Sequence, residues 1–259
     1  MEKQLSPRTV LSYRNALVLP LKSIFKIDFS HEAFSLLARS QFIARPPVRK
    51  SIPQWPLQDV LKGLKVMILD GSSHSSDILM KSLFLTALAT GNRASELSSI
   101  DNSGINWNRD KNLVTLPVRP GFLFKNQRAH RAPPNIVLKS LSVPTQDSSL
   151  CPINSLKIYL KHTEKIRKGS SLFVSPTSGT GLKASSISLW LSKTILRFCP
   201  NSLPKAHDVR KQAASLAWVR GISPAEIIKA AFWSSSDIFI RSYLNPEVED
   251  SVPCLALGS

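Results

Sequence analysis

The chain carries a set of side chains suited to holding and attacking a phosphate group. In chain order they are Arg93, His207, Arg210, Trp233 and Tyr243. Planar guanidinium groups hold a phosphate through paired hydrogen bonds. A tyrosine hydroxyl can attack the phosphorus and form a covalent intermediate. These residue types therefore predict displacement chemistry at a phosphodiester.

Each side chain can be given a role in that chemistry. Negative charge grows on the non-bridging oxygens of an attacked phosphate, and fixed cations such as Arg93 and Arg210 lower the barrier. His207 precedes Arg210 by one helical turn, so both can face the same phosphate. A neutral imidazole accepts a proton near neutral pH. The indole of Trp233 offers one N–H donor, and Tyr243 would be the nucleophile.

The departing 5′-oxygen of a cleaved strand needs a proton, and a basic segment at residues 125–131 offers a donor. The best candidate in this segment is Lys125. Lys111 and Lys139 lie near it in the sequence and remain alternatives. Lys125 is therefore predicted to be the general acid.

The composition indicates a polyanionic partner. Lys and Arg number 34 against 17 Asp and Glu, which gives a formal net charge of +17. Such a surplus attracts nucleic acid, although a ribosomal or membrane-surface protein can be equally basic. The predicted DNA-binding residues are Arg45, Arg49, Lys50, Arg128, Arg131 and Lys211. The simplest alternative is that the basic segments are solvated connectors and loops.

Several classes of protein are disfavoured. Cys151, Cys199 and Cys254 are odd in number and widely spaced, so neither a disulfide framework nor a zinc site is indicated. No metal or cofactor is expected. The first seven residues lack the apolar h-region of a signal peptide, and no apolar run approaches the roughly 18 residues that span a bilayer. We expect a soluble protein that is not secreted and does not contact a membrane.

Apolar periodicity predicts helices over most of the chain. The first helix begins at Ser6 and is interrupted at Pro20. A later helix, 237–244, carries Tyr243. The other predicted helices cover 31–44, 57–68, 77–89, 153–160, 185–198, 207–219 and a short stretch from Ser223. Strands are predicted at 113–116 and 135–138, with 122–124 as a further candidate. The predicted fold class is mainly α with a small antiparallel β-sheet (α+β).

A basic connector with two prolines, residues 45–50, predicts a domain boundary because proline opposes helix continuation. The boundary separates a small helical segment at 1–48 from a larger domain at 51–259, which a family resemblance identifies as a partial DNA-clamping segment and a catalytic domain.

In this order the residues resemble the catalytic domain of tyrosine recombinases, the phage-integrase superfamily. Segment 88–97 (LATGNRASEL) looks like the family's first arginine box, in which Glu96 would brace the fold, and 207–211 (HDVRK) is similar to its His-x-x-Arg box. Trp233 falls where members carry histidine or tryptophan. Tyr243 matches the nucleophile, and Lys125 matches the hairpin lysine. Segments 151–153 and 232–237 look most like eukaryotic DIRS and Ngaro retroelement recombinases.

The resemblance covers residues 51–244 and implies breakage and rejoining of double-stranded DNA through a 3′-phosphotyrosyl intermediate, without metal. It implies a homo-tetramer on two duplexes, in the nucleus of a eukaryote or in the cytoplasm or nucleoid of a bacterium or phage. Two departures stand out. The part before Ser51 is shorter than the family's DNA clamp, and Pro246 and Pro253 interrupt the tail that would join protomers.

Two alternative functions remain open, together with simpler interpretations of single residues. A domesticated protein derived from a mobile element would bind DNA without cutting it. A ribosomal or RNA-associated protein would prefer RNA. At the level of single residues, Arg93 could form only a surface ion pair with Glu96, worth about 0.3–0.5 kcal/mol. His207 could instead be a core or capping histidine, and Tyr243 a buried aromatic.

Overall fold

The computed structural model describes residues 5–26, 32–46, 55–70, 73–125, 127, 130, 135–141 and 148–232. The chain separates into two compact units, Met1–Ser51 and Ile52–Ser259. Six predicted site residues lie outside the described residues: Arg49, Lys50, Arg128, Arg131, Trp233 and Tyr243. The helix predicted at 237–244 also lies outside them.

The first unit contains two helices, α1 (Pro7–Phe25) and α2 (Glu32–Ala44). The α1 helix starts as the sequence predicts, because the hydroxyl of Ser6 accepts a hydrogen bond from the N–H of Thr9. The prediction that Pro20 interrupts this helix is wrong, since α1 continues to Phe25. Proline has a helical φ and removes only one N–H, so a helix can pass through it at a cost.

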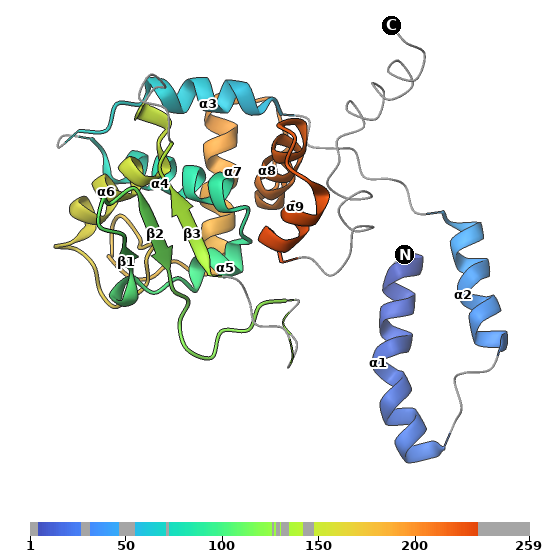
Figure 1. The fold of residues 1–259 in the computed structure, drawn as a ribbon. Helices are drawn as coiled ribbons and strands as arrows, with labels where there is room; N and C mark the ends of the chain where they lie inside the picture. The colour runs from blue at the N-terminus through green and yellow to red at the C-terminus, as the bar shows by residue number, and fades with distance from the viewer. Residues whose placement is uncertain are drawn as a thin grey trace, which may run out of the picture. The chain divides into compact units, whose positions relative to one another are not determined.

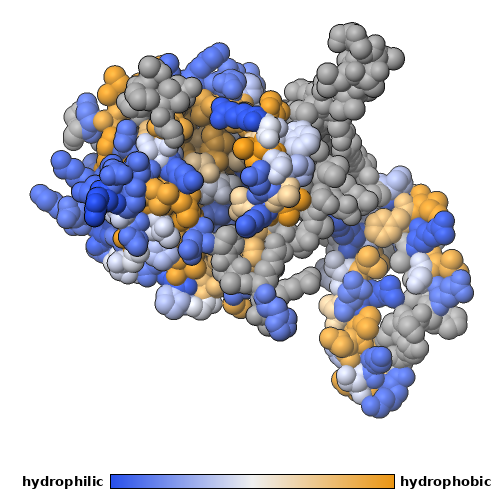
Figure 2. Space-filling model, viewed as in Figure 1, coloured by the Kyte–Doolittle hydropathy of each residue, from blue (hydrophilic) through white to orange (hydrophobic). Residues whose placement is uncertain are grey.

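The surface of this first unit is rich in apolar side chains (Figure 2). None of the α1 residues is buried, and Leu19 is 73% exposed. Ile24 and Ile43 are exposed as well. The described part of this unit therefore has no core of its own.

The core of the second unit is built around α4 (Ser75–Thr90), which contacts α6 (Pro152–Thr163), α7 (Ala184–Phe198) and α8 (Ala206–Val219) (Figure 1). The helix α4 is apolar on all sides, and a helix of that kind is stable only when it is surrounded. Its central residues, including Leu83 and Phe84, are fully buried, as the sequence predicts.

A three-stranded antiparallel sheet contacts α4 and α6 through its last strand. Its order is β1 (Asn106–Trp107), β2 (Leu113–Leu116) and β3 (Ile136–Lys139). Val114 lies opposite Leu138, and both are buried. The prediction of a strand at 122–124 is wrong: the third strand is β1. Gly121 takes a φ of +79° and turns the chain there, so the alternating aromatic residues point into tertiary contacts.

The remaining elements are short. They are α3 (Leu57–Val66), α5 (Ala94–Ser98), α9 (Pro224–Ala230) and two 3-10 helices, Asn102–Gly104 and Ser148–Leu150. The predicted fold class, mainly α with a small antiparallel sheet, is confirmed. Among the helices of the described residues, none combines the length and apolarity needed to cross a bilayer.

Candidate active site

The corner between α4 and α5 positions Arg93. Gly91 ends α4 with a φ of +62°, a conformation that glycine adopts without strain, and its N–H donates to the carbonyl of Ala87. Arg93 is the N-cap of α5, where its backbone N–H donates to Glu96 Oε2 at 2.8 Å. Its guanidinium Nη1 lies 2.6 Å from Glu96 Oε1. Arg93 is thus fixed through both its main chain and its side chain.

The helix α8 carries Arg210 into the interior of the second unit. The helix is capped at its start, where Asp208 accepts a hydrogen bond from the N–H of Lys205 at 2.9 Å. The Arg210 guanidinium donates to two backbone carbonyls, that of Gly91 at 2.6 Å and that of Ala231 at 2.5 Å. These two residues follow the ends of α4 and α9. Arg210 is only 2% exposed. A guanidinium this deeply buried requires such partners, because desolvation of a charge is costly.

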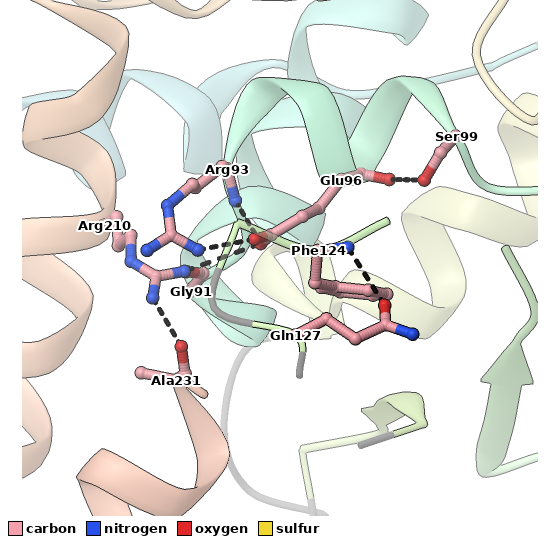
Figure 3. A network of polar contacts seen from close by, with 8 residues as sticks. All are labelled: Gly91, Arg93, Glu96, Ser99, Phe124, Gln127, Arg210 and Ala231. Atoms are coloured by element: carbon pink, nitrogen blue, oxygen red, sulfur yellow. Dashed lines mark hydrogen bonds and ion pairs between the residues drawn. The ribbon is translucent and has the colours of Figure 1, made fainter. Parts of the chain in front are cut away.

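A single carboxylate, that of Glu96, links the two arginines (Figure 3). Its Oε1 contacts Arg93, and its Oε2 lies 3.6 Å from Nη1 of Arg210. Glu96 is 2% exposed, so this contact is not the surface ion pair that the simplest alternative expected. The three side chains together carry a net charge of +1, which leaves the cluster attractive to an anion.

A pocket of about 320 Å³ opens beside this cluster. Its lining comes from the beginnings of α5, α7 and α8: Asn92, Arg93, Ala94, Ser95, Ala184, Ser185, Ser188, Ala206, His207 and Arg210. Helix N-termini carry partial positive charge and present free N–H groups. The pocket therefore combines two guanidinium groups and an imidazole with helix ends that favour negative charge.

His207 lies at this pocket with a pKa lowered to about 4. Desolvation is the first cause, followed by the positive charges of Arg210, Lys211 and Arg93, while Asp208 opposes the shift. The residue also keeps an exposed surface, where water moderates desolvation. Desolvation and the neighbouring positive charges both lower the pKa of His207. The imidazole is therefore neutral at pH 7 and can accept a proton.

This lowered pKa predicts a loss of stability in acid. Between pH 6.5 and about 4 the unfolded chain binds a proton at His207 that the folded chain does not, so falling pH favours unfolding. We expect the melting temperature to fall less in a His207→Gln protein than in the unchanged chain over this window. Thermal unfolding at pH 4.5 and pH 7 measures it, with His74→Gln as the control. Equal losses in all three proteins would contradict the assignment.

Lys125 lies in an exposed turn. The turn is closed by two hydrogen bonds between Phe124 and Gln127, one from the Gln127 N–H and one to its side-chain oxygen. Lys125 is not among the described residues that line the pocket. The alternatives Lys111 and Lys139 lie at the β1–β2 turn and at the end of β3, and they do not line it either.

Two of the predicted DNA-binding residues can be placed. Arg45 is exposed just after α2, in the first unit. Lys211 follows Arg210 on α8, and its Nζ lies 3.9 Å from Asp208. Its side chain is mostly covered, which leaves Arg45 the more accessible of the two.

Sequence reasoning missed several residues of the pocket, among them the polar residues Asn92, Ser185 and Ser188. The side-chain nitrogen of Asn92 is fully enclosed, and no hydrogen-bond partner for it lies among the described residues. The position of Asn92 between Gly91 and Arg93 could have predicted that it lines the pocket, because a polar residue next to a predicted catalytic arginine lies close to the same ligand. The two serines gave a weaker signal, since hydroxyls are common in the first turn of a helix.

Within the described residues, no group of three or more His, Cys, Asp or Glu side chains is placed to hold a metal ion. The donors at the pocket are mostly cationic or neutral. They suit an anionic ligand.

No protein-family model and no curated protein matches the sequence. Solved recombinase structures do match the fold. XerA recombinase aligns over 98% of this chain and 84% of its own, with a TM-score of 0.54 and 16% identity. The Tn1549 transposon integrase in complex with transposon right-end DNA aligns over 100% and 82%, with a TM-score of 0.60 and 13% identity.

A third match is XerH site-specific recombinase bound to its palindromic difH substrate in a post-cleavage complex. It aligns over 78% of this chain and 51% of its own, with a TM-score of 0.55 and 14% identity. At these identities the likeness is one of fold. The chain has the mainly helical fold, with a small antiparallel sheet, of tyrosine recombinase catalytic domains.

Proposed function

We propose that the protein breaks and rejoins DNA strands at specific sites through a tyrosine–phosphate intermediate. One observation carries the proposal: Arg93 and Arg210, far apart in the sequence, share the carboxylate of Glu96 beside a pocket that His207 also lines. Two fixed guanidinium groups at one pocket are suited to the charge of an attacked phosphate. The fold, similar to that of known recombinases, supports the same activity.

In the proposed reaction the phenolic oxygen of Tyr243 bonds to phosphorus, and the bond from phosphorus to the 5′-oxygen breaks. His207, neutral at pH 7, takes the phenolic proton. Lys125 gives a proton to the 5′-oxygen. Arg93 and Arg210 stabilise the charge on the non-bridging oxygens, and Trp233 donates to one of them. Reversal of these steps with another 5′-hydroxyl rejoins a strand.

The proposed partner is double-stranded DNA, with four protomers on two duplexes. The net charge of +17 supports a polyanionic partner. The structures of XerH and of Tn1549 integrase were solved with DNA. We include in the proposal an origin in a mobile element, which the segments similar to DIRS and Ngaro recombinases support, and action in a nucleus or nucleoid.

Binding to duplex DNA is expected to weaken steeply with salt, because each neutralised phosphate releases counterions. With about 6–10 phosphate contacts, affinity falls roughly 10³–10⁵-fold between about 50 and 200 mM salt. Fluorescence anisotropy with a labelled duplex measures it. An Arg45→Ala protein should show a shallower slope, by about one unit. A flat response, or stronger binding to RNA, would contradict a DNA partner.

The activity itself is tested by covalent trapping. A duplex nicked just beyond the cleaved phosphate releases a short strand that diffuses away, so rejoining fails and the covalent adduct accumulates. We expect a protein–DNA band that survives denaturation and forms equally in EDTA. Retention of DNA without any adduct would instead support the alternative, a domesticated binding protein.

A further inference from the structure

The residue after the end of α9 adopts a strained backbone conformation. Phe232 has a φ of +52°, in the left-handed region, where a side chain with a Cβ is disfavoured. Glycine adopts this conformation freely. Strained residues persist when their surroundings fix them, and they cluster at functional sites. Since Phe232 is also only 5% exposed, its ring is held in place by contacts.

Those contacts are aromatic and reach the turn that carries the predicted general acid. The Phe232 ring meets Phe124 edge to face, with centroids 5.9 Å apart and planes at 79°. Phe124 meets Phe122 in the same way at 5.2 Å. Edge-to-face pairs have a defined geometry. The row of three rings therefore fixes the end of α9 against residues 122–124.

The other side of the same corner is attached to the arginine cluster. The carbonyl of Ala231, which directly precedes Phe232, accepts the hydrogen bond from Arg210. The N–H of Ala231 donates to Ile227 within α9 at 2.8 Å. Figure 3 shows Ala231 beside Arg210 and Phe124 close to the same cluster. One two-residue corner thus touches both the arginine cluster and the aromatic row.

The Phe232 ring is one of the buried side chains of the core of the second unit. A cavity of about 200 Å³ lies beside it. Its lining includes Asn92, Glu96, Phe124, Ala231 and Phe232. The ring's edge-to-face contact with Phe124 links it to residues 122–124.

We propose that the contact between Phe232 and Phe124 is a positioning contact, which sets the turn carrying Lys125 at a fixed place relative to Arg93 and Arg210. This inference rests on the proposed function, in which Lys125 protonates the departing oxygen. Lys125 is exposed, and among the described residues its turn is closed by the hydrogen bonds between Phe124 and Gln127. The adjacent aromatic row supplies the link from that turn to the arginine cluster.

The test uses two DNA substrates in single-turnover cleavage. One has the natural 5′-oxygen at the cleaved bond, and the other has sulfur there. A thiolate leaves without a proton, because a thiol has a pKa of about 8.5. Misplacement of a catalytic group by about 1 Å can cost about 100-fold in rate. We therefore expect Phe232→Leu and Phe232→Gly to slow cleavage of the oxygen substrate about 10–100-fold.

Both variants should cleave the sulfur substrate at close to the rate of the unchanged chain, as Lys125→Ala should. Phe232→Gly distinguishes the loss of the ring from a change in backbone strain, because glycine adopts the left-handed conformation freely and has no ring. The control is Leu123→Ala, in the same segment but 73% exposed; it should leave both rates unchanged. Slowing of both substrates alike by the Phe232 variants would overturn the inference. Failure of the unchanged chain to cleave either substrate would instead overturn the proposed function.

Discussion

A Tyr243→Phe protein is expected to bind duplex DNA as the unchanged chain does and to form no covalent adduct. The substitution removes one oxygen and leaves the net charge unchanged, so the contacts that govern affinity remain. The phenolic oxygen is the atom that would bond to phosphorus, and phenylalanine has no other nucleophile. Covalent trapping on the nicked duplex, together with anisotropy under the same conditions, measures both properties.

The chain supplies two controls, since tyrosine occurs only at positions 13, 159 and 243. Tyr159 is buried, its hydroxyl accepts the N–H of Val174 at 2.7 Å, and desolvation raises its pKa to about 12. Tyr13 is exposed on α1, in the other unit. Tyr13→Phe should retain the adduct in full. Tyr159→Phe should retain it too, at some loss of stability, because a buried N–H loses its acceptor.

An adduct formed by the Tyr243→Phe protein would refute the assignment of Tyr243 as the nucleophile. Peptide mapping of the adduct would then identify the residue that does attack. An adduct lost in Tyr13→Phe but kept in Tyr243→Phe would move the nucleophile to the first unit.

Long helices could be predicted well from the sequence, because their signal is local. The apolar stretch around Leu83 predicts a surrounded helix whatever lies around it, and α4 is such a helix. The pairing of His207 with Arg210 follows from helix spacing alone. Even the meeting of Arg93 with Arg210 was expected, but only from the order of the motifs, since no local rule brings residues so far apart together.

The failures come from contacts between distant parts of the chain. Residues 122–124 are all apolar, as in a short strand, yet the Phe122 ring packs on Phe124, and the Phe124 ring packs on Phe232 just beyond α9. Nothing near Phe232 in the sequence indicates a left-handed residue, because that conformation is set by tertiary contacts. Likewise, no local pattern shows that the Arg210 head binds two main-chain carbonyls.

Glu96→Ala is expected to lower the free energy of unfolding by about 3–5 kcal/mol, the usual cost of removing one partner of a buried ion pair. Glu96 lies between two guanidinium groups, and Arg210 is as deeply buried as the carboxylate itself. Without that carboxylate, two like charges face each other in a place that water scarcely reaches. The loss should also abolish adduct formation, because repulsion displaces Arg93 from the pocket. Urea unfolding measures the stability change, provided that the slope m is unchanged.

A matched control is the exposed pair between Arg197 and Asp77, whose closest atoms lie 2.5 Å apart. Asp77→Ala removes a carboxylate from an arginine in the same way, but at the surface, where such a pair is worth about 0–1 kcal/mol. Added salt should weaken the contribution of Asp77 and leave that of Glu96 nearly unchanged, since buried charges are poorly screened. Glu96→Gln keeps an acceptor for the Arg93 N–H and should lose less stability than Glu96→Ala. If Glu96→Ala and Asp77→Ala lower the free energy of unfolding by the same amount, the shared carboxylate does not hold the two arginines together.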